Sequence, residues 1–531
     1  MNRISNNINY WYFPLVVFIV IFYYQMPGYA MDVTLQWDAN TEPDLCGYEI
    51  YYKTGSPGKP YDKVYIVTLD KLRDPDHPAF TLTCLDPDEY YYFAVTAFDS
   101  EDLRSDYSSE VNSIPPIYFP YIVSGDKWET EICVINTSDT VQVMGKFTAH
   151  TSKGLPVSGV VSVNLDPHAR REITIGNEFI DSGDIGYITF ETNSASVVGY
   201  AKFFIDDHYR VALPAVFDSD INEGDIYISH IVSGGEKTPW YTAVSLLNTT
   251  ASSQNVAFEF NNGQRKEAHF EAKEQKSFAI RDLFDGQQPQ PDITSAVVTN
   301  ADGIIGLELF INNVWHWIDG ILLRDDANAR IYYPHVALKD DWVTGIVAYN
   351  PFDDFCDITV IPYGETGSIL MPVLYDTIGV REKYVGVVSD LGLPDDTAWL
   401  EIEASNPIKG LEIFARENQM AAYAAVGIGD TEGVFAKLER DGWTGIVLVN
   451  VTQYPTVVTM TAYDDNGFVI AADMICLNPL ERLAQSAESF FTKGENIENA
   501  TYIAYSSDRE IAGLQFNTSS DGMMLDCLPG M

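Results

Sequence analysis

The feature that most constrains the fold is a pattern of Trp, Asn and Gly that occurs four times along the chain. In each copy a Trp opens a short β-like run that ends in Asn, and about sixty residues later a Gly lies in an apolar run; the copies recur at about one hundred residues. A regular period of this length indicates tandem copies of one domain. The copies contain Trp128, Asn136 and Gly199; Trp240, Asn248 and Gly306; Trp342, Asn350 and Gly410; and Trp443, Asn450 and Gly513.

Each copy reads as a run of short strands separated by turn signals, without a convincing helical period. The pattern therefore predicts an antiparallel β-sandwich in each copy. A propeller is the alternative, but its blades are only about 40–45 residues long. The repeated Trp is expected to cap the core, the Asn to end a strand by bonding its own turn, and the Gly to permit close packing. In the last copy, Trp443 lies one residue nearer to its Asn than in the others.

The chain before the first copy alternates in the runs around Trp37 and Tyr91, with turn signals between them. This stretch, residues 31–115, resembles a fibronectin type III domain. Trp37 falls where that family places its core Trp, and Leu85 to Tyr91 matches the turn that positions the tyrosine corner. The resemblance implies that the Tyr91 hydroxyl bonds back to the backbone. Domains of this family serve as spacers and as binding modules, so the resemblance does not choose a function.

We expect an all-β chain in which a fibronectin type III sandwich precedes four related sandwiches, strung as beads on short polar linkers. The copies resemble the hundred-residue β repeats found in bacterial exported proteins, a resemblance that carries no activity. The expected boundaries are a signal peptide at 1–30, the fibronectin-like domain at 31–115, and repeats at 116–217, 226–324, 331–427 and 432–531.

The N-terminus has the composition of an export signal. Arg3 is the only charged residue before an apolar run from Trp11 to Tyr24, and small residues precede Met31, which favours cleavage after Ala30. The net charge of −44 disfavours nucleic acid and anionic membranes as partners. We therefore expect a secreted or cell-surface protein, without membrane insertion after cleavage, whose partners are extracellular proteins or polysaccharides.

The six cysteines are distributed unevenly, and the second copy has none, so disulfides do not define the fold. Cys476 and Cys527, both in the last copy, are the candidate pair for a disulfide within one repeat. The other cysteines are expected to act as small buried hydrophobic residues.

No catalytic or cofactor motif is present, and the histidines are scattered singly. The chain is therefore expected to be non-enzymatic, without a cofactor, and to act as a structural, adhesion or binding module. A carbohydrate-binding accessory protein is the first alternative. An extracellular hydrolase is the second, because paired carboxylates can meet in space without any sequence signature.

Two features point to ligands. Trp315 and Trp317 place two indoles on one face of a strand, which favours either stacking on sugar rings or packing against a neighbouring domain. The alternating oxygen side chains of the linker before the second repeat match the ligands that Ca²⁺ prefers, but the spacing departs from an EF-hand loop and we favour a solvated linker. These linker residues are Asp218, Asp220, Asn222 and Asp225.

Overall fold

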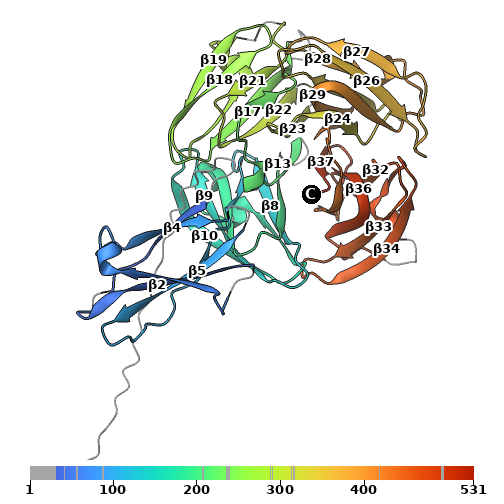
Figure 1. Cartoon of the computed structure of the whole chain (residues 1–531). Coiled ribbons are helices and arrows are strands. Elements are labelled where there is room, and N and C mark those ends of the chain that lie inside the picture. The colour runs from blue at the N-terminus through green and yellow to red at the C-terminus, as the bar shows by residue number, and fades with distance from the viewer. Residues whose placement is uncertain are drawn as a thin grey trace, which may run out of the picture. The chain divides into compact units, whose positions relative to one another are not determined.

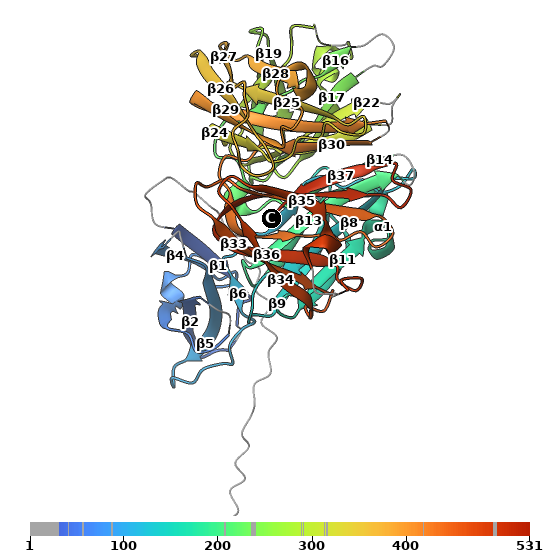
Figure 2. The same ribbon diagram turned by 90° about the vertical axis from the view of Figure 1, so that its right-hand side faces the viewer.

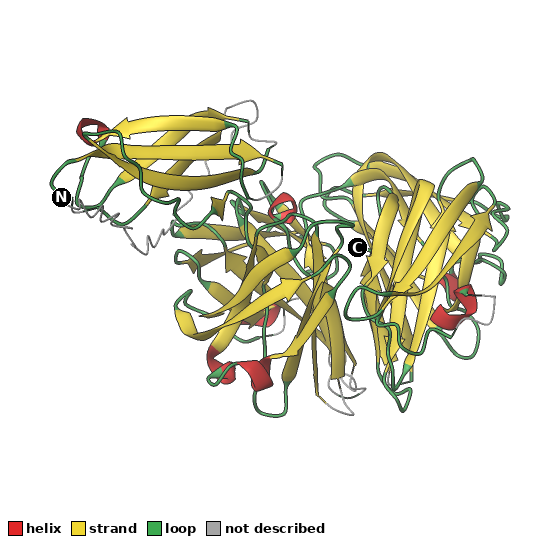
Figure 3. Ribbon diagram, turned by 90° about the horizontal axis from the view of Figure 1, so that it is seen from below, coloured by secondary structure: helices red, strands yellow, loops and turns green. Residues whose placement is uncertain are grey.

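The computed structural model is an all-β structure with a few single-turn helices (Figure 3). Among the described residues, no helix is long and apolar enough to cross a membrane. The chain divides into two compact units, of which the first comprises the residues up to Pro115 with Glu191–Ala195 and the second comprises the rest. The structure describes residues 31–40, 42–55, 58–86, 89–205, 209–234, 240–287, 289, 291–312, 314, 317–417, 419–491 and 496–531.

The first unit is a sandwich of a β1-β4 sheet and a β3-β2-β5-β6 sheet. Trp37 is 3% exposed in its core and lies 5.1 Å from the ring of Tyr48. The Tyr91 hydroxyl accepts a hydrogen bond of 2.9 Å from the Asp86 amide, which is the tie to the backbone expected of a tyrosine corner. Its elements are β1 (Met31–Gln36), β2 (Leu45–Thr54), β3 (Lys63–Thr68), η1 (Leu69–Lys71), β4 (Ala79–Leu85), β5 (Tyr91–Asp99) and β6 (Val111–Asn112).

The second unit contains four segments, here called segments 1 to 4, each built from two antiparallel sheets. Segment 1 contains β7 (Ile117–Phe119), β8 (Glu129–Asn136), β9 (Val143–Thr151), β10 (Pro156–Leu165), β11 (Arg170–Thr174), α1 (Ile175–Glu178), η2 (Ser182–Asp184), β12 (Ile185–Thr192), β13 (Val197–Ile205) and β14 (Tyr209–Pro214). After η3 (Asp218–Asp220), segment 2 contains β15 (Ile226–Ile228), β16 (Ser233–Gly234), β17 (Trp240–Asn248), β18 (Gln254–Phe260), β19 (Arg265–Phe270), β20 (Gln275–Ala279), η4 (Ile280–Phe284), β21 (Ala296–Thr299), β22 (Ile304–Asn312) and β23 (Trp317–Leu323).

In the last two segments, one long strand takes the place of two and contributes to both sheets. Segment 3 contains β24 (Asn328–Tyr333), β25 (Val343–Tyr349), β26 (Cys356–Tyr363), β27 (Leu374–Ile378), β28 (Lys383–Val387), η5 (Val388–Asp390), β29 (Trp399–Arg416) and β30 (Gln419–Ala424). Segment 4 contains β31 (Asp430–Phe435), β32 (Trp443–Asn450), β33 (Thr456–Tyr463), β34 (Val469–Leu477), β35 (Arg482–Ser486), η6 (Ala487–Phe490), β36 (Tyr502–Thr518) and β37 (Leu525–Pro529).

The strand order is the same in all four segments. In segment 1 the outer sheet is β10-β9-β12-β7 and the inner sheet is β11-β8-β13-β14. In segment 4 the corresponding orders are β34-β33-β36-β31 and β35-β32-β36-β37. Each segment has its own apolar core between the two sheets. The prediction of an all-β sandwich architecture is therefore confirmed.

The inner sheets are buried on both faces. In β8, Ile132 and Val134 face the core of segment 1, whereas Cys133 and Ile135 belong to a cluster shared with segment 4. Three further clusters join segment 1 to 2, 2 to 3 and 3 to 4, and we call the four contacts interfaces 1/2, 2/3, 3/4 and 4/1. The segments therefore close into a ring, in which the strands β14, β23, β30 and β37 contact one another in turn (Figures 1 and 2). The expectation of separate beads is wrong, because the second sheet face of each segment is apolar and is covered by a neighbour.

Small residues let the four central strands approach one another. The register of each strand with its inner-sheet partner places a small, buried residue at the same position in all four. At one of these positions, the Cys527 thiol donates to the Ala422 carbonyl across interface 3/4 at 2.9 Å. The four residues are Ala212, Gly320, Ala422 and Cys527.

The same hydrogen bond recurs at all four interfaces. One residue of each segment adopts a left-handed conformation, with φ of 54° to 60°, two residues before the strand that edges the inner sheet. Its carbonyl accepts a hydrogen bond from a side chain of the preceding segment. The pairs are Tyr187 with Lys273 (3.2 Å), Ser295 with Arg381 (3.3 Å), Trp399 with Leu480 (3.1 Å) and Tyr502 with His168 (2.7 Å). The closing interface 4/1 is therefore of the same kind as the other three.

The repeated Asn is a structural clamp in every segment. Its Nδ2 donates to a backbone carbonyl in the turn that follows and to a second carbonyl four residues before the edge strand of the inner sheet, and its Oδ1 accepts from the amide two residues later. Asn136, for example, donates to the Val141 carbonyl at 2.8 Å and accepts from the Ser138 amide at 3.0 Å. All four side chains are 0% exposed, and they are Asn136, Asn248, Asn350 and Asn450.

The repeated Gly pairs with the residue two positions before the repeated Asn, as in the pairing of Gly410 with Ala348. A Cβ on Gly410 would meet the side chains of Ile331 and Ala425, so this position requires a residue without a side chain. The corresponding positions are Gly199, Gly306 and Gly513.

The predicted bond between Cys476 and Cys527 is wrong, because all six cysteines are free. Cys476 is exposed on β34 of the outer sheet, whereas Cys527 is buried on β37 at the centre of the ring. The two thiols therefore belong to different sheets of segment 4.

Candidate functional site

Interface 3/4 encloses a cavity of about 570 Å³, within the range of about 300–1,000 Å³ that is typical of ligand sites. We call it the aromatic cleft, because its walls include Trp342 and Phe414 from segment 3 and Trp443 and Phe516 from segment 4. Trp443 is 45% exposed, while Phe414 and Phe516 are buried. Exposed carboxylates lie around this cleft, and they are Asp340, Glu365, Asp395 and Asp396.

A histidine and an arginine line the inner part of the aromatic cleft. The His335 ring lies 5.5 Å from Phe414 and 5.3 Å from Phe516, and its Nδ1 accepts a hydrogen bond from the Arg482 guanidinium. Burial and the charge of Arg482 lower the pKa of His335 well below its usual 6.5, so the imidazole is neutral at pH 7. Burial also lowers the pKa of Arg482 to about 10, which leaves the guanidinium charged. Its buried Nε has no hydrogen-bond partner among the residues that the structure describes.

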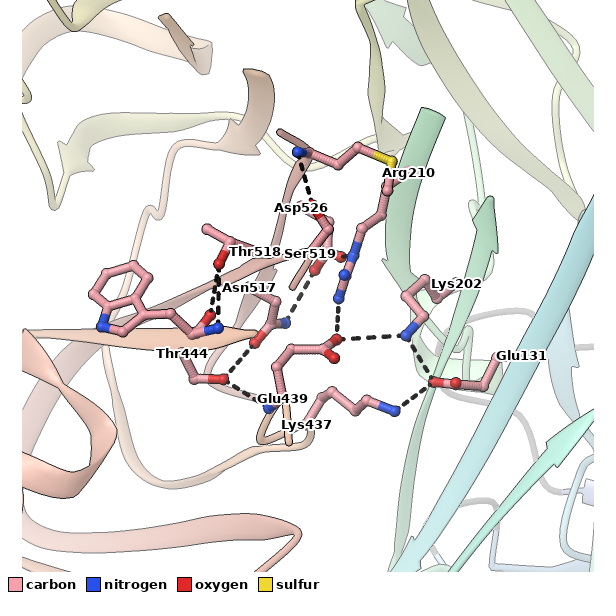
Figure 4. A network of polar contacts seen from close by, with 12 residues as sticks. Glu131, Lys202, Arg210, Lys437, Glu439, Thr444, Asn517, Thr518, Ser519 and Asp526 are labelled. Atoms are coloured by element: carbon pink, nitrogen blue, oxygen red, sulfur yellow. Dashed lines mark hydrogen bonds and ion pairs between the residues drawn. The ribbon is translucent and has the colours of Figure 1, made fainter. Parts of the chain in front are cut away.

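Interface 4/1 has a different chemistry at the corresponding place (Figure 4). His335 lies two residues beyond β24 and Lys437 two residues beyond β31, while Arg482 and Arg170 each begin the edge strand of an inner sheet. Lys437 donates to Glu131 at 3.0 Å and to Glu172 at 2.8 Å, both in segment 1. At interface 4/1, cations therefore occupy both of these positions, and the carboxylates of segment 1 neutralise them.

The ion pairs of interface 4/1 continue toward the ring centre. Lys202 lies 3.2 Å from Glu131 and 3.5 Å from Glu439. The Arg210 guanidinium pairs with both Glu439 and Asp526. Asp526 is 0% exposed and also accepts a hydrogen bond of 3.0 Å from Asn517. We call these ion-paired residues the ionic cluster. Its members are Glu131, Arg170, Glu172, Lys202, Arg210, Lys437, Glu439 and Asp526.

The charges of the ionic cluster stabilise one another. Burial raises the pKa of the Glu172 carboxyl, but the adjacent Arg170 and Lys437 outweigh burial and hold it well below its usual range. Burial opposes the charged form of Lys437, and Glu131 and Glu172 nevertheless raise its pKa. A cavity of about 380 Å³ remains beside these groups. Charged side chains make up most of its lining, whereas the walls of the aromatic cleft include four aromatic rings.

The exposure of Trp443 follows from its offset in the sequence. In segments 1 to 3 the Trp precedes a buried Thr by two residues, so both side chains point to one face of the strand. Trp443 directly precedes Thr444 and therefore points to the opposite face. Its benzo ring fills the space that a side chain at Gly445 would occupy. The three other Trp residues are half-buried in clusters between segments, and they are Trp128, Trp240 and Trp342.

The predicted indole platform is not formed by Trp317. Its ring lies half-buried in the cluster at interface 2/3, 5.6 Å from Trp240, and its Nε1 donates to the Glu417 carbonyl at 2.7 Å. The structure therefore agrees with the alternative interpretation, in which this indole packs against a neighbouring segment. Trp315 lies outside the described residues.

The predicted calcium linker is part of segment 2. Asn222 is 2% exposed, and its Nδ2 donates to the Ile304 carbonyl at 2.7 Å. Asp220 accepts a hydrogen bond of 2.6 Å from Arg324. Burial raises the pKa of both Asp218 and Asp225, which disfavours their charged forms. Within the described residues, no group of three or more His, Cys, Asp or Glu is arranged to hold a metal ion.

No family model matches the chain, and no curated protein matches it significantly. Among solved structures, trypsin-activated alpha-2-macroglobulin from Escherichia coli aligns at 8% identity and a TM-score of 0.14, over 95% of this chain and 47% of that chain. Streptomyces avermitilis alpha-L-rhamnosidase complexed with L-rhamnose aligns at 10% identity and a TM-score of 0.14, over 95% of this chain and 58% of that chain. The Salmonella alpha-2-macroglobulin mutant Y1175G aligns at 9% identity and a TM-score of 0.12, over 94% of this chain and 45% of that chain. The chain thus spans about half the length of these proteins, and TM-scores this low carry no argument about fold or function.

Proposed function

We propose that this protein is an exported, non-enzymatic binding protein of the cell surface or extracellular space. The observation that carries the proposal is the aromatic cleft of about 570 Å³, which segments 3 and 4 form together. Trp443 is the exposed indole of its wall, and a large apolar ring in a concave site favours ligand binding over core packing. The ring of segments acts as a rigid support that fixes the two walls relative to each other.

We further propose that the first unit is a fibronectin type III domain and that the four segments are tandem copies of one repeat. The buried Trp37 and the bond from the Asp86 amide to the Tyr91 hydroxyl support the first assignment. The common strand order and the repeated Asn clamp support the second. The fibronectin-like unit would serve as a spacer or as an additional binding module.

Export rests on the N-terminal signal pattern, which lies outside the described residues. N-terminal sequencing of protein collected from the medium or the cell surface tests it, and we expect the mature chain to begin at Met31. A chain that retains residues 1–30 and stays inside the cell would contradict export.

Retention on immobilised collagen and fibronectin, and on insoluble cellulose and chitin, tests the binding function. We expect at least one material to retain the full chain, and the variant Trp443→Ala to lose that retention. Equal retention of Trp443→Ala, or no retention of the wild type, would contradict a binding role of the cleft. Release of reducing sugars from a retained polysaccharide would instead support the hydrolase alternative and contradict a non-enzymatic role.

A further inference from the structure

We propose that the aromatic cleft binds a neutral polysaccharide chain, with a sugar ring stacked on Trp443. This inference rests on the proposed binding function and names its ligand class. It assigns the sugar site to interface 3/4 and not to Trp315 and Trp317.

The apolar part of the argument concerns the exposed indole. Trp443 is 45% exposed, although burying such a ring would be favourable. Its partner wall, Trp342, already has the Arg416 guanidinium 5.9 Å from its ring centroid. A pyranose ring has one face of C–H groups that is flat, apolar and similar in size to an indole. Such a ligand would cover the exposed surface of Trp443 without requiring any movement of segments 3 and 4.

The polar part of the argument concerns the mixture of donors and acceptors. Arg482 lines the cavity with its side chain 7% exposed, and arginine acts only as a donor. Carboxylates such as Asp395 and Asp396, on the same cavity, act only as acceptors. Hydroxyl groups are the common chemical groups that donate and accept at once. A ligand with several hydroxyl groups satisfies both sides of this cleft.

Charge separates a neutral sugar from the other ligand classes. The exposed carboxylates of the cleft and the net charge of −44 repel acidic polysaccharides. A cationic ligand would suit the carboxylates and the aromatic rings, but it would meet the charged Arg482 inside the cleft. A neutral polyol avoids both repulsions.

The test is isothermal titration of the full chain with single hexasaccharides of β-1,4-glucan, β-1,3-glucan, α-1,4-glucan, xylan, mannan and chitin. Polygalacturonate serves as the anionic probe and a lysine-rich peptide as the cationic probe. We expect at least one neutral hexasaccharide to bind and to change tryptophan fluorescence. Trp443→Ala should weaken this binding by about tenfold or more, because central Trp residues dominate binding energies.

Two controls keep the test specific. Tyr375→Ala removes an exposed aromatic ring (79% exposed) from β27 of segment 3, outside the lining of the cleft, and should leave the affinity unchanged. Arg482→Lys retains the charge while altering the donors, and should weaken binding without abolishing it. Circular dichroism melts of each variant verify that it is folded.

The outcomes separate this inference from the proposed function. No binding of any neutral hexasaccharide, or binding that Trp443→Ala leaves unchanged, overturns the sugar assignment. If only the anionic or the cationic probe binds and Trp443→Ala abolishes that binding, the sugar assignment fails while the binding function stands. If no probe or immobilised material binds through the cleft, both fail.

Discussion

Interfaces 3/4 and 4/1 differ in one residue that lies two positions after the first strand of a segment. His335 follows β24 of segment 3 at interface 3/4, and Lys437 follows β31 of segment 4 at interface 4/1. Arg482 begins the edge strand of segment 4 at interface 3/4, and Arg170 begins the edge strand of segment 1 at interface 4/1. Both interfaces are formed by equivalent strands, and in both a side chain donates a hydrogen bond to the carbonyl of a residue in the left-handed conformation. Aromatic rings surround the first site, whereas carboxylates neutralise the second. One backbone arrangement can therefore produce either an open cleft or an ion-paired contact, and the side chains decide which.

The largest expected effect comes from breaking the ionic cluster. Arg210→Ala leaves the fully buried Asp526 without its cation and should lower the free energy of unfolding by about 3–5 kcal/mol. Chemical denaturation measures the loss, and hydrogen exchange should localise the opening to β14 and β37. The control Arg265→Ala removes an exposed guanidinium and should cost about 0–1 kcal/mol. A loss for Arg210→Ala no larger than that of the control would show that the cluster does not hold the ring closed.

The second prediction separates the two interfaces by pH. The folded-state pKa of His335 lies below 6.5, so the unfolded chain binds a proton that the folded chain does not, and stability falls as the pH drops below about 6.5. Between pH 6.5 and 5, the wild type should lose up to roughly 2 kcal/mol relative to His335→Gln. Urea denaturation of both proteins at several pH values measures this difference.

The matched variant at interface 4/1 is Glu172→Gln. The folded-state pKa of Glu172 is depressed, so its stabilisation is fully present above the unfolded pKa and disappears as the pH falls through the lower folded value. The difference between the wild type and Glu172→Gln should therefore stay constant from pH 7 to 5 and shrink only below about 4.3. The same pH dependence for both variants would contradict the distinction between the two interfaces.

The third prediction tests whether the closing interface matches the others. Tyr502→Phe at interface 4/1 and Tyr187→Phe at interface 1/2 remove equivalent hydrogen bonds to the carbonyls of His168 and Lys273. Each should cost about 0.5–1.5 kcal/mol by chemical denaturation. An effect at Tyr187 with none at Tyr502 would mean that segment 4 does not dock on segment 1 as the other pairs do.

The smallest expected effect concerns the linker before segment 2. Asp220 and Asn222 already have protein partners, so excess calcium, compared with a chelator, should leave the melting temperature unchanged. Scanning calorimetry measures it. If calcium raises the melting temperature and Asp218→Asn abolishes that increase, the prediction of a metal site in this linker stands.

Local structure could be predicted reliably from the sequence. Alternation and turn signals indicated short antiparallel strands, and the spacing of Trp, Asn and Gly indicated a repeated sandwich. The closed ring was missed, although a signal for it exists in runs such as Ile446, Val447, Leu448 and Val449, where alternation is lost. A continuous apolar run is typical of a sheet buried on both faces. Such a run does not say which surface covers the second face.

The candidate site shows the same limit. The offset of Trp443 was visible in the sequence, and a one-residue slip reverses the face to which a strand side chain points. Its consequence could not be predicted, because the opposite face borders Trp342 and Phe414 of segment 3 only after segments 3 and 4 have packed. Trp317, which looked more suited to a ligand, is instead held by the Glu417 carbonyl of the next segment.

The sequence by itself determined the strands, their turns and the fourfold period, because these depend on backbone geometry within one segment. The tertiary structure decided that the ring closes and that a cleft exists. Closure pairs Arg210 with Asp526, which are 316 positions apart, and the cleft requires walls from two segments. Complementarity between such distant surfaces is a property of the packed sheets and is not encoded in any local pattern.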